Sequence, residues 1–149
     1  MKSFMCKLAA SCAALTLVAS SALAAAGWGD DYEKGLAQAK AEKKLVLLDF
    51  TGSDWCGWCI KLDKEVFSKK EFKDYAKDNL VLVEVDFPQT KKLAKKLKEQ
   101  NDKLQAQYGI KGYPTIVVLN PDGKKVGELG YQEGGPTAFT AKLDALKGK

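Results

Sequence analysis

Histidine and arginine are both absent from this chain of 149 residues. The lack of histidine removes the commonest general base and the commonest metal ligand, and it argues against a Cys-His hydrolase, whose nucleophile needs an adjacent base. The lack of arginine means that all 24 basic residues are lysines, so the chain cannot form bidentate guanidinium contacts to phosphates or base edges. The sequence therefore predicts no nucleic-acid partner.

Cysteine is scarce as well, with four in the chain, of which Cys56 and Cys59 form a C-x-x-C pair. One such pair supplies two thiolates, whereas a closed zinc site needs four ligands. A copper(I) site built from two thiolates is one alternative. A structural cross-link is another, although so small a ring removes only roughly 2 kcal/mol of unfolded-chain freedom. We therefore expect redox chemistry at this pair, with no metal and no cofactor.

The beginning of the chain has the pattern of a secretory signal. Lys2 and Lys7 flank the start of an Ala/Leu/Val-rich stretch at residues 8–20, and Ala22-Leu23-Ala24 forms a small-x-small cleavage site. We expect a signal at residues 1–24, with cleavage after residue 26 as the alternative, and one domain at residues 25–149. An uncleaved membrane anchor is the other alternative, since the run is barely long enough to span a bilayer. The mature protein is expected to be soluble and periplasmic or otherwise exported.

Strand-like and helix-like patterns alternate along the rest of the chain. An Asn-Pro-Asp-Gly turn at residues 120–123 predicts an antiparallel hairpin, and strands joined through helices should run parallel. The fold class is therefore α/β, with a mixed sheet of four to five strands and helices on both faces. Two helices have a predicted cap: Ser68 and Glu71 form a capping box, and Thr90 is the N-cap of the lysine-rich helix. The predicted strands are 45–50, 80–85, 115–119 and 124–129. The predicted helices are 30–44, a segment after Cys56, 68–78, 90–109 and 136–147.

The segment Trp55-Cys56-Gly57-Trp58-Cys59 directly follows the first long strand. Its first cysteine lies at a strand-to-helix junction, where unpaired backbone N–H groups and the helix dipole favour a thiolate. We therefore interpret Cys56 as the nucleophile. Cys59 lies almost one turn further on and is expected to be more enclosed, so it can resolve a mixed disulfide by attacking Cys56. The spacing predicts a thiol-disulfide exchanger.

Two segments resemble the signature sequences of the thioredoxin superfamily: the pentapeptide at residues 55–59 and Tyr-Gly-Ile-Lys-Gly-Tyr-Pro-Thr at residues 108–115. Residues 54–67 are similar to exported single-domain thioredoxin-like proteins and to the terminal domain of DsbD-type reductant carriers. The resemblance implies a thioredoxin-like fold and a protein-disulfide oxidoreductase that acts as a reductase. It also implies cysteine-containing exported proteins as clients and a membrane protein as electron donor.

The resemblance further implies a substrate-binding face next to the cysteines. Pro114 would follow a cis peptide bond and lie against the two cysteines, which leaves the backbone of Tyr113 free to pair with an extended client. Trp55 and Trp58 would form an apolar rim around the sulfur atoms, with Gly57 between the two cysteines. Trp58 stands where the family commonly has proline, so the motif alone does not set the reduction potential.

Two acidic residues are implied near the thiols by the same resemblance. Asp49 matches the buried acid that shuttles a proton for the resolving cysteine, although no lysine accompanies it in residues 80–86. Asp63, four residues after Cys59, matches an acid that raises a thiol pKa in DsbD-type domains; a solvated helix aspartate is the alternative. Two other functions stay open at this point: a non-catalytic thioredoxin-like binding or chaperone module, and a copper(I)-delivery protein.

Overall fold

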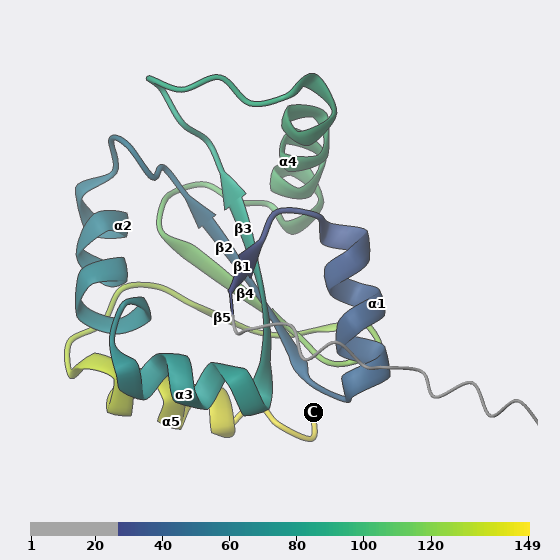
Figure 1. Ribbon diagram of the computed structural model, residues 1–149, viewed down its shortest axis with the longest axis vertical. Coiled ribbons are helices and arrows are strands. Elements are labelled where there is room, and N and C mark those ends of the chain that lie inside the picture. The colour runs from purple at the N-terminus through teal and green to yellow at the C-terminus, as the bar shows by residue number, and fades with distance from the viewer. Residues whose placement is uncertain (1–26) are drawn as a thin grey trace, which may run out of the picture.

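The computed structural model describes residues 27–149 (Figure 1), so the predicted signal segment lies outside the described residues. The predicted α/β class is confirmed, with a five-stranded sheet in the order β1-β3-β2-β4-β5. The strands are β1 (Trp28–Gly29), β2 (Leu45–Thr51), β3 (Leu80–Asp86), β4 (Thr115–Leu119) and β5 (Lys125–Leu129). The helices are α1 (Tyr32–Glu42), α2 (Gly57–Leu62), the π-helical η1 (Asp63–Phe67), α3 (Lys70–Asn79), α4 (Lys95–Tyr108) and α5 (Gly135–Asp144).

The sheet is mixed, as the order of the elements predicts. β3 pairs in parallel with β1 and with β2, whereas β4 pairs antiparallel with β2 and β5, so the predicted C-terminal hairpin is present. β2 and β3 stay in register from Leu45↔Leu80 to Thr51↔Asp86. The carboxyl ends of these two parallel strands therefore meet at one edge of the sheet, where the cysteine segment begins.

Helices cover both faces of the sheet (Figure 1). Successive side chains of a strand point to opposite faces, so Leu47 packs with α2, η1, α3 and α5, while its neighbour Leu48 packs with α1 and α4. The first core contains an aromatic cluster in which the Phe139 ring lies 5.5 Å from that of Phe67 and 6.1 Å from that of Phe72. These buried groups stabilise the face of the sheet that also carries the cysteines.

Two predicted helix caps are wrong. Both α3 and α4 begin later than predicted, and neither has a side-chain hydrogen bond at its N-cap. The hydroxyl of Ser68 instead donates to Asp63, and the hydroxyl of Thr90 donates to Asp54. The Ser68 hydroxyl thus binds a carboxylate five residues before it, and the Thr90 hydroxyl binds one 36 residues before it, while neither residue is an N-cap.

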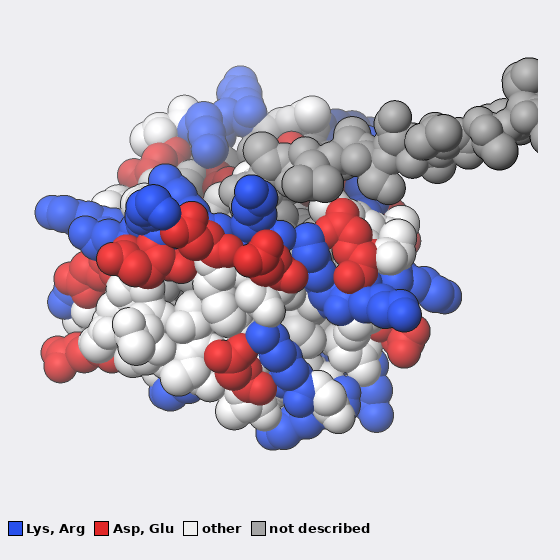
Figure 2. Space-filling view, turned by 60° about the horizontal axis from the view of Figure 1, so that its bottom comes forward, with Lys and Arg blue, Asp and Glu red and all other residues white. Residues whose placement is uncertain are grey.

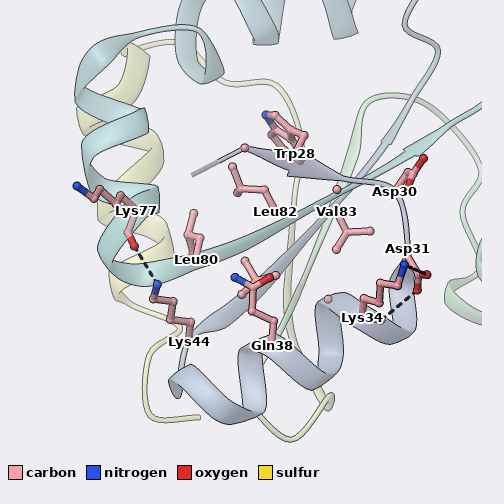
Figure 3. Close-up of a pocket in the computed structure, with 14 residues that line it drawn as sticks. Trp28, Asp30, Asp31, Lys34, Gln38, Lys44, Lys77, Leu80, Leu82 and Val83 are labelled. Atoms are coloured by element: carbon pink, nitrogen blue, oxygen red, sulfur yellow. Dashed lines mark hydrogen bonds and ion pairs between the residues drawn. The ribbon is translucent and has the colours of Figure 1, made fainter. Parts of the chain in front are cut away.

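The outer edge of β3 carries two features that the sequence pattern did not predict. The two-residue strand β1 pairs with Leu82 and Val83, and a cavity of about 380 Å³ follows this edge between α1 and α3 (Figure 3). Lys44, just after α1, donates from Nζ to the Lys77 carbonyl at 2.9 Å. Helix α1 approaches β3 so closely that a Cβ atom at Gly35 would lie 2.6 Å from Val83 Cγ2. The lining of this cavity contains no cysteine.

Charges of both signs are mixed on the surface. Figure 2 shows lysines and acidic residues interspersed over one face of the molecule. Within residues 27–149, no helix combines the length and the hydropathy needed to cross a bilayer.

Three of the five lysines at residues 91–98 form ion pairs, namely Lys91–Asp86, Lys95–Glu99 and Lys98–Asp102.

Candidate active site

Cys56 and Cys59 are joined by a disulfide bond at the start of α2, with their Cα atoms 5.2 Å apart. Cys56 is the N-cap of the helix, and its Sγ accepts a hydrogen bond from the Cys59 backbone N–H at 3.2 Å. The expected difference in enclosure is not found, because both residues are 6% exposed. Cys56 differs from Cys59 in its position at the helix N-terminus, which stabilises a thiolate after reduction.

Exposed aromatic side chains flank the disulfide. Trp55 is 42% exposed and Trp58 is 57% exposed, and Ile60 beside them is half exposed. The Trp55 indole N–H donates to the Phe87 carbonyl at 2.7 Å, and its ring meets the Tyr113 ring edge-on at 5.8 Å. This contact holds the Trp55 side of the rim against the segment that contains the predicted docking residues.

The Tyr113–Pro114 peptide bond is cis. The Tyr113 ring packs between two other aromatic residues, 5.8 Å from the Trp55 ring and 5.4 Å from the Phe87 ring. Tyr113 also accepts a hydrogen bond at its hydroxyl from the Gln105 side chain of α4. The residue is therefore fixed by its side chain at the edge of the cysteine segment.

The other side of the rim contains Trp58. Its ring lies 5.0 Å from the Tyr131 ring, and Lys61 Nζ lies 5.0 Å from the first ring and 4.8 Å from the second. The Tyr131 hydroxyl donates to Glu65 Oε2 at 2.6 Å. Gly57, between the two halves of the rim, is exposed, and a Cβ atom added there would meet nothing within 4 Å.

A polar cavity of about 260 Å³ lies behind the disulfide, and Asp49, Asp63 and Cys59 all line it. Asp49 is 9% exposed, and its Oδ1 has no hydrogen-bond partner among residues 27–149. Burial, followed by the charges of Glu84, Asp63 and Asp86, raises the pKa of Asp49 to about 8. The structure thus brings Asp49 and Asp63 into one cavity with Cys59, the predicted resolving cysteine.

Asp63 is not a free carboxylate. Its Oδ2 accepts a hydrogen bond from the Ser68 hydroxyl at 2.9 Å, across the single turn of η1. The sequence predicted a regular helix here, whereas the structure changes from α2 to the wider η1 at this residue. Asp63 therefore faces the cavity from a rare type of turn that often occurs near functional sites.

Asp54 anchors the cysteine loop to the segment after β3. It accepts hydrogen bonds from the backbone N–H groups of Gln89, Thr90 and Lys91 at 2.9, 2.8 and 3.4 Å, and from the Thr90 hydroxyl. These bonds, the Thr90 hydroxyl first, hold the pKa of Asp54 well below its usual range. This role was not predicted from the sequence, because an aspartate before a tryptophan carries no signal for a partner thirty-five residues away.

Replacing Asp54 with alanine should loosen this loop. We expect the amides of Gln89, Thr90 and Lys91 to exchange with solvent about tenfold faster, because each loses its acceptor. Hydrogen exchange followed by NMR measures this directly, with Asp122→Ala, in the distant hairpin turn, as the matched control. Unchanged exchange at all three amides would contradict the anchoring role.

Comparison with known proteins identifies the family of this chain. Residues 32–147 match the thioredoxin-like domain family. The chain belongs to the thioredoxin superfamily. This match spans every element from α1 to α5, so it includes both the cysteine pair and the cis proline of this thioredoxin-like domain.

Relatives of this thioredoxin-like chain include named disulfide-exchange proteins. It is 39% identical to the disulfide bond reductase DsbH of Chlamydia pneumoniae over 119 residues. This match covers 79% of this chain and 72% of that protein. A solved structure of a DsbH oxidoreductase has 35% sequence identity and a TM-score of 0.77, over 91% of this chain and 94% of the other. DsbD of Pseudoalteromonas atlantica is 31% identical over 97 residues, which are 65% of this chain and 15% of that protein. The predicted similarity to DsbD domains is therefore confirmed.

The family and the bonded Cys56–Cys59 pair together identify a thiol-disulfide oxidoreductase. The predicted enzyme class is confirmed at this level. Within residues 27–149, no group of three or more His, Cys, Asp or Glu side chains is placed to hold a metal ion.

Proposed function

We propose that this protein is an exported disulfide reductase, which passes two electrons from the Cys56/Cys59 dithiol to disulfides of other exported proteins. The observation that carries the proposal is the position of Cys56, an N-cap whose sulfur accepts a backbone hydrogen bond inside an exposed aromatic rim. A helix N-terminus lowers the pKa of a thiol, so a reduced Cys56 can attack a disulfide near neutral pH. No cofactor is needed for this chemistry.

The reaction has two exchange steps. In the first step the Cys56 thiolate attacks a client disulfide and forms a mixed disulfide, and one client sulfur leaves as a thiolate. In the second step Cys59 loses its proton and attacks Cys56 Sγ, which re-forms the Cys56–Cys59 bond and releases the second client sulfur. Asp49 lines the same cavity as Cys59 and would accept that proton.

The exposed rim supports docking of an extended client. Trp55 and Trp58 present apolar surface on both sides of the sulfurs, and exposed aromatic rings contribute much of the binding energy at protein interfaces. Tyr113 and cis-Pro114 lie at the Trp55 side, where the backbone of Tyr113 would pair with the client strand. The rim would act in the same way if the protein only bound its partners, so docking alone does not separate a reductase from a binding module.

One comparison supports the direction, and one feature of the sequence supports the compartment. The DsbH relative of Chlamydia pneumoniae is named a disulfide bond reductase, and a signal-like segment precedes the domain. An exported reductase must be recharged after each turnover, which we assign to a membrane electron-donor protein. The similarity to part of DsbD is consistent with a domain that receives electrons by dithiol exchange.

The reduction potential tests the direction. We expect a value nearer to the roughly −270 mV of thioredoxin than to the roughly −120 mV of a strong oxidant such as DsbA. Equilibration in glutathione or dithiothreitol buffers, followed by tryptophan fluorescence, gives this value because Trp55 and Trp58 flank the disulfide. The Cys59→Ser variant, which cannot close the bond, is the control and should show no such transition. A potential near the oxidising end would reject the reductase.

A further inference from the structure

Glu84 is a charged residue inside the otherwise apolar run of β3, and its place in the sheet is unusual. It is the register partner of Asp49 across the parallel β2–β3 ladder. Strand alternation turns both side chains to the face that α2 covers. Both residues line the cavity of about 260 Å³ that also contains Cys59. A second carboxylate is therefore built next to the buried acid and the resolving thiol.

The other acids close to Asp49 are already occupied. Asp63 accepts the Ser68 hydroxyl, and Asp86 accepts the backbone N–H and hydroxyl of Ser53 and pairs with Lys91 Nζ at 2.9 Å. By contrast, no hydrogen bond or ion pair joins Glu84 to another side chain within residues 27–149. Asp30 and Lys91 are the further charged groups that act on Glu84. Glu84 is thus the acid of this cavity without a side-chain partner among the described residues, and its charge acts on Asp49 more strongly than those of Asp63 and Asp86.

We propose that Glu84 is a positioning residue that controls the proton held on Asp49 and, through it, the pH dependence of the step in which Cys59 attacks Cys56. Two carboxylates that share a poorly solvated site do not ionise independently, since the charge on one disfavours the charge on the other. A basic residue opposite Asp49 would favour the ionised form. The acid found there favours the protonated form instead.

In the resolving step, one proton moves from the Cys59 thiol to the Asp49 carboxylate. Asp49 first loses its proton through the cavity, past Glu84, to solvent. The Cys59 thiol then gives its proton to the Asp49 carboxylate while its sulfur attacks Cys56, and the client sulfur leaves with the electron pair of the broken bond. Burial raises the pKa values of both Asp49 and Glu84, which agrees with a pair that holds a proton near neutral pH. In the reductase direction, this inference rests on the proposed function.

The test compares Glu84→Gln with wild type in two measurements. Carbon-13 NMR of the side-chain carboxyls follows the titration of Asp49, and stopped-flow kinetics follow release of a fluorescent peptide from a preformed mixed disulfide on Cys56. We expect Asp49 to titrate at lower pH in the variant and the resolving rate at about pH 6.5 to rise about fivefold, since removal of the like charge favours the basic form of Asp49. Glu84→Lys should shift both in the same direction and further.

The controls separate this effect from a loss of structure. Glu71→Gln removes the same charge from an exposed position on α3 and should leave both profiles unchanged. Asp49→Asn should remove this part of the pH profile altogether. If neither Glu84 variant folds, coupled titration of Glu84 and Asp49 in the wild-type protein decides the matter. Independent titration of the two groups, or an unchanged profile in Glu84→Gln, would overturn the proposal.

The outcomes also distinguish this inference from the proposed function. A protein that oxidises clients, or only binds them, would fail the reduction-potential test but would still show the Asp49 titration move in Glu84→Gln. A reducing potential together with an unchanged Asp49 titration in Glu84→Gln would support the proposed function and contradict the role of Glu84.

Discussion

Replacing Cys56 with serine should abolish disulfide exchange, whereas replacing Cys59 with serine should preserve the first step and trap the client. A serine hydroxyl is not ionised near neutral pH, so the N-cap of α2 has no anion to stabilise and no nucleophile to present. We expect turnover of a fluorescent disulfide peptide to fall at least about 10³-fold in Cys56→Ser. In Cys59→Ser the Cys56 thiolate still attacks, but no second thiol releases the product.

Mass spectrometry of intact protein measures the difference, because Cys59→Ser should gain the mass of one peptide and Cys56→Ser should gain none. Both variants keep the same backbone and lack the same disulfide, so each controls for the loss of the cross-link in the other. Adducts on Cys59 in the Cys56→Ser variant would contradict the assignment of the nucleophile. Undiminished client binding by a variant that lacks both cysteines, without any adduct in Cys59→Ser, would favour the binding module.

Replacing Asp49 with asparagine should make the fold more stable and the enzyme slower. The pKa of Asp49 is raised to about 8 in the folded protein, against 3.8 for an ordinary aspartate. As the pH rises from about 4 to about 8, the unfolded chain releases this proton before the folded one, so the stability of the wild type falls across that window. Asparagine cannot ionise, and the variant escapes this loss.

The gain in the free energy of unfolding of Asp49→Asn has an upper bound, which is set by the difference between the pKa values of Asp49 in the unfolded and folded states. At about pH 7 the gain in stability reaches at most about 4 kcal/mol, and it should shrink to zero below about pH 3, where Asp49 is protonated in both the folded and the unfolded wild type. Denaturant unfolding at several pH values measures the difference, and the exposed Asp122→Asn is the matched control. A stability difference that does not grow with pH would show that Asp49 is ionised in the folded protein. The resolving step should slow in the same variant, because Cys59 loses its proton acceptor.

The sequence predicted the parts of the fold that rest on long apolar runs and on the helices between them. β2, β3, β4 and the final hairpin are each marked by a compact run or by a strong turn. By contrast, β1 has two residues, too few for any periodicity. The Ser68 and Thr90 caps failed for another reason. Both helices begin later than the local pattern indicates, and both hydroxyls donate to aspartates, one of which, Asp54, lies 36 residues away.

The candidate site shows the same division. Cys56 and Cys59 were predicted from their local spacing in the sequence. Asp49 and Asp63 were predicted from the family resemblance. Glu84 was not predicted as a site residue, although an acid between the apolar residues Val83 and Val85 was a usable signal once the β2–β3 register was known. The contact between Trp58 and Tyr131 joins residues seventy-three positions apart and could not be inferred without the fold.

Gly57 is a position in the active site where a side chain can be added without a steric clash. It lies between the two cysteines, yet a side chain added there would project into open space. Most positions around the disulfide are held by hydrogen bonds or ring contacts, so a substitution would disturb packing as well as chemistry. Position 57 is thus a natural place for directed evolution to adjust redox poise, or to attach a reporter beside the sulfur atoms, without repacking the domain.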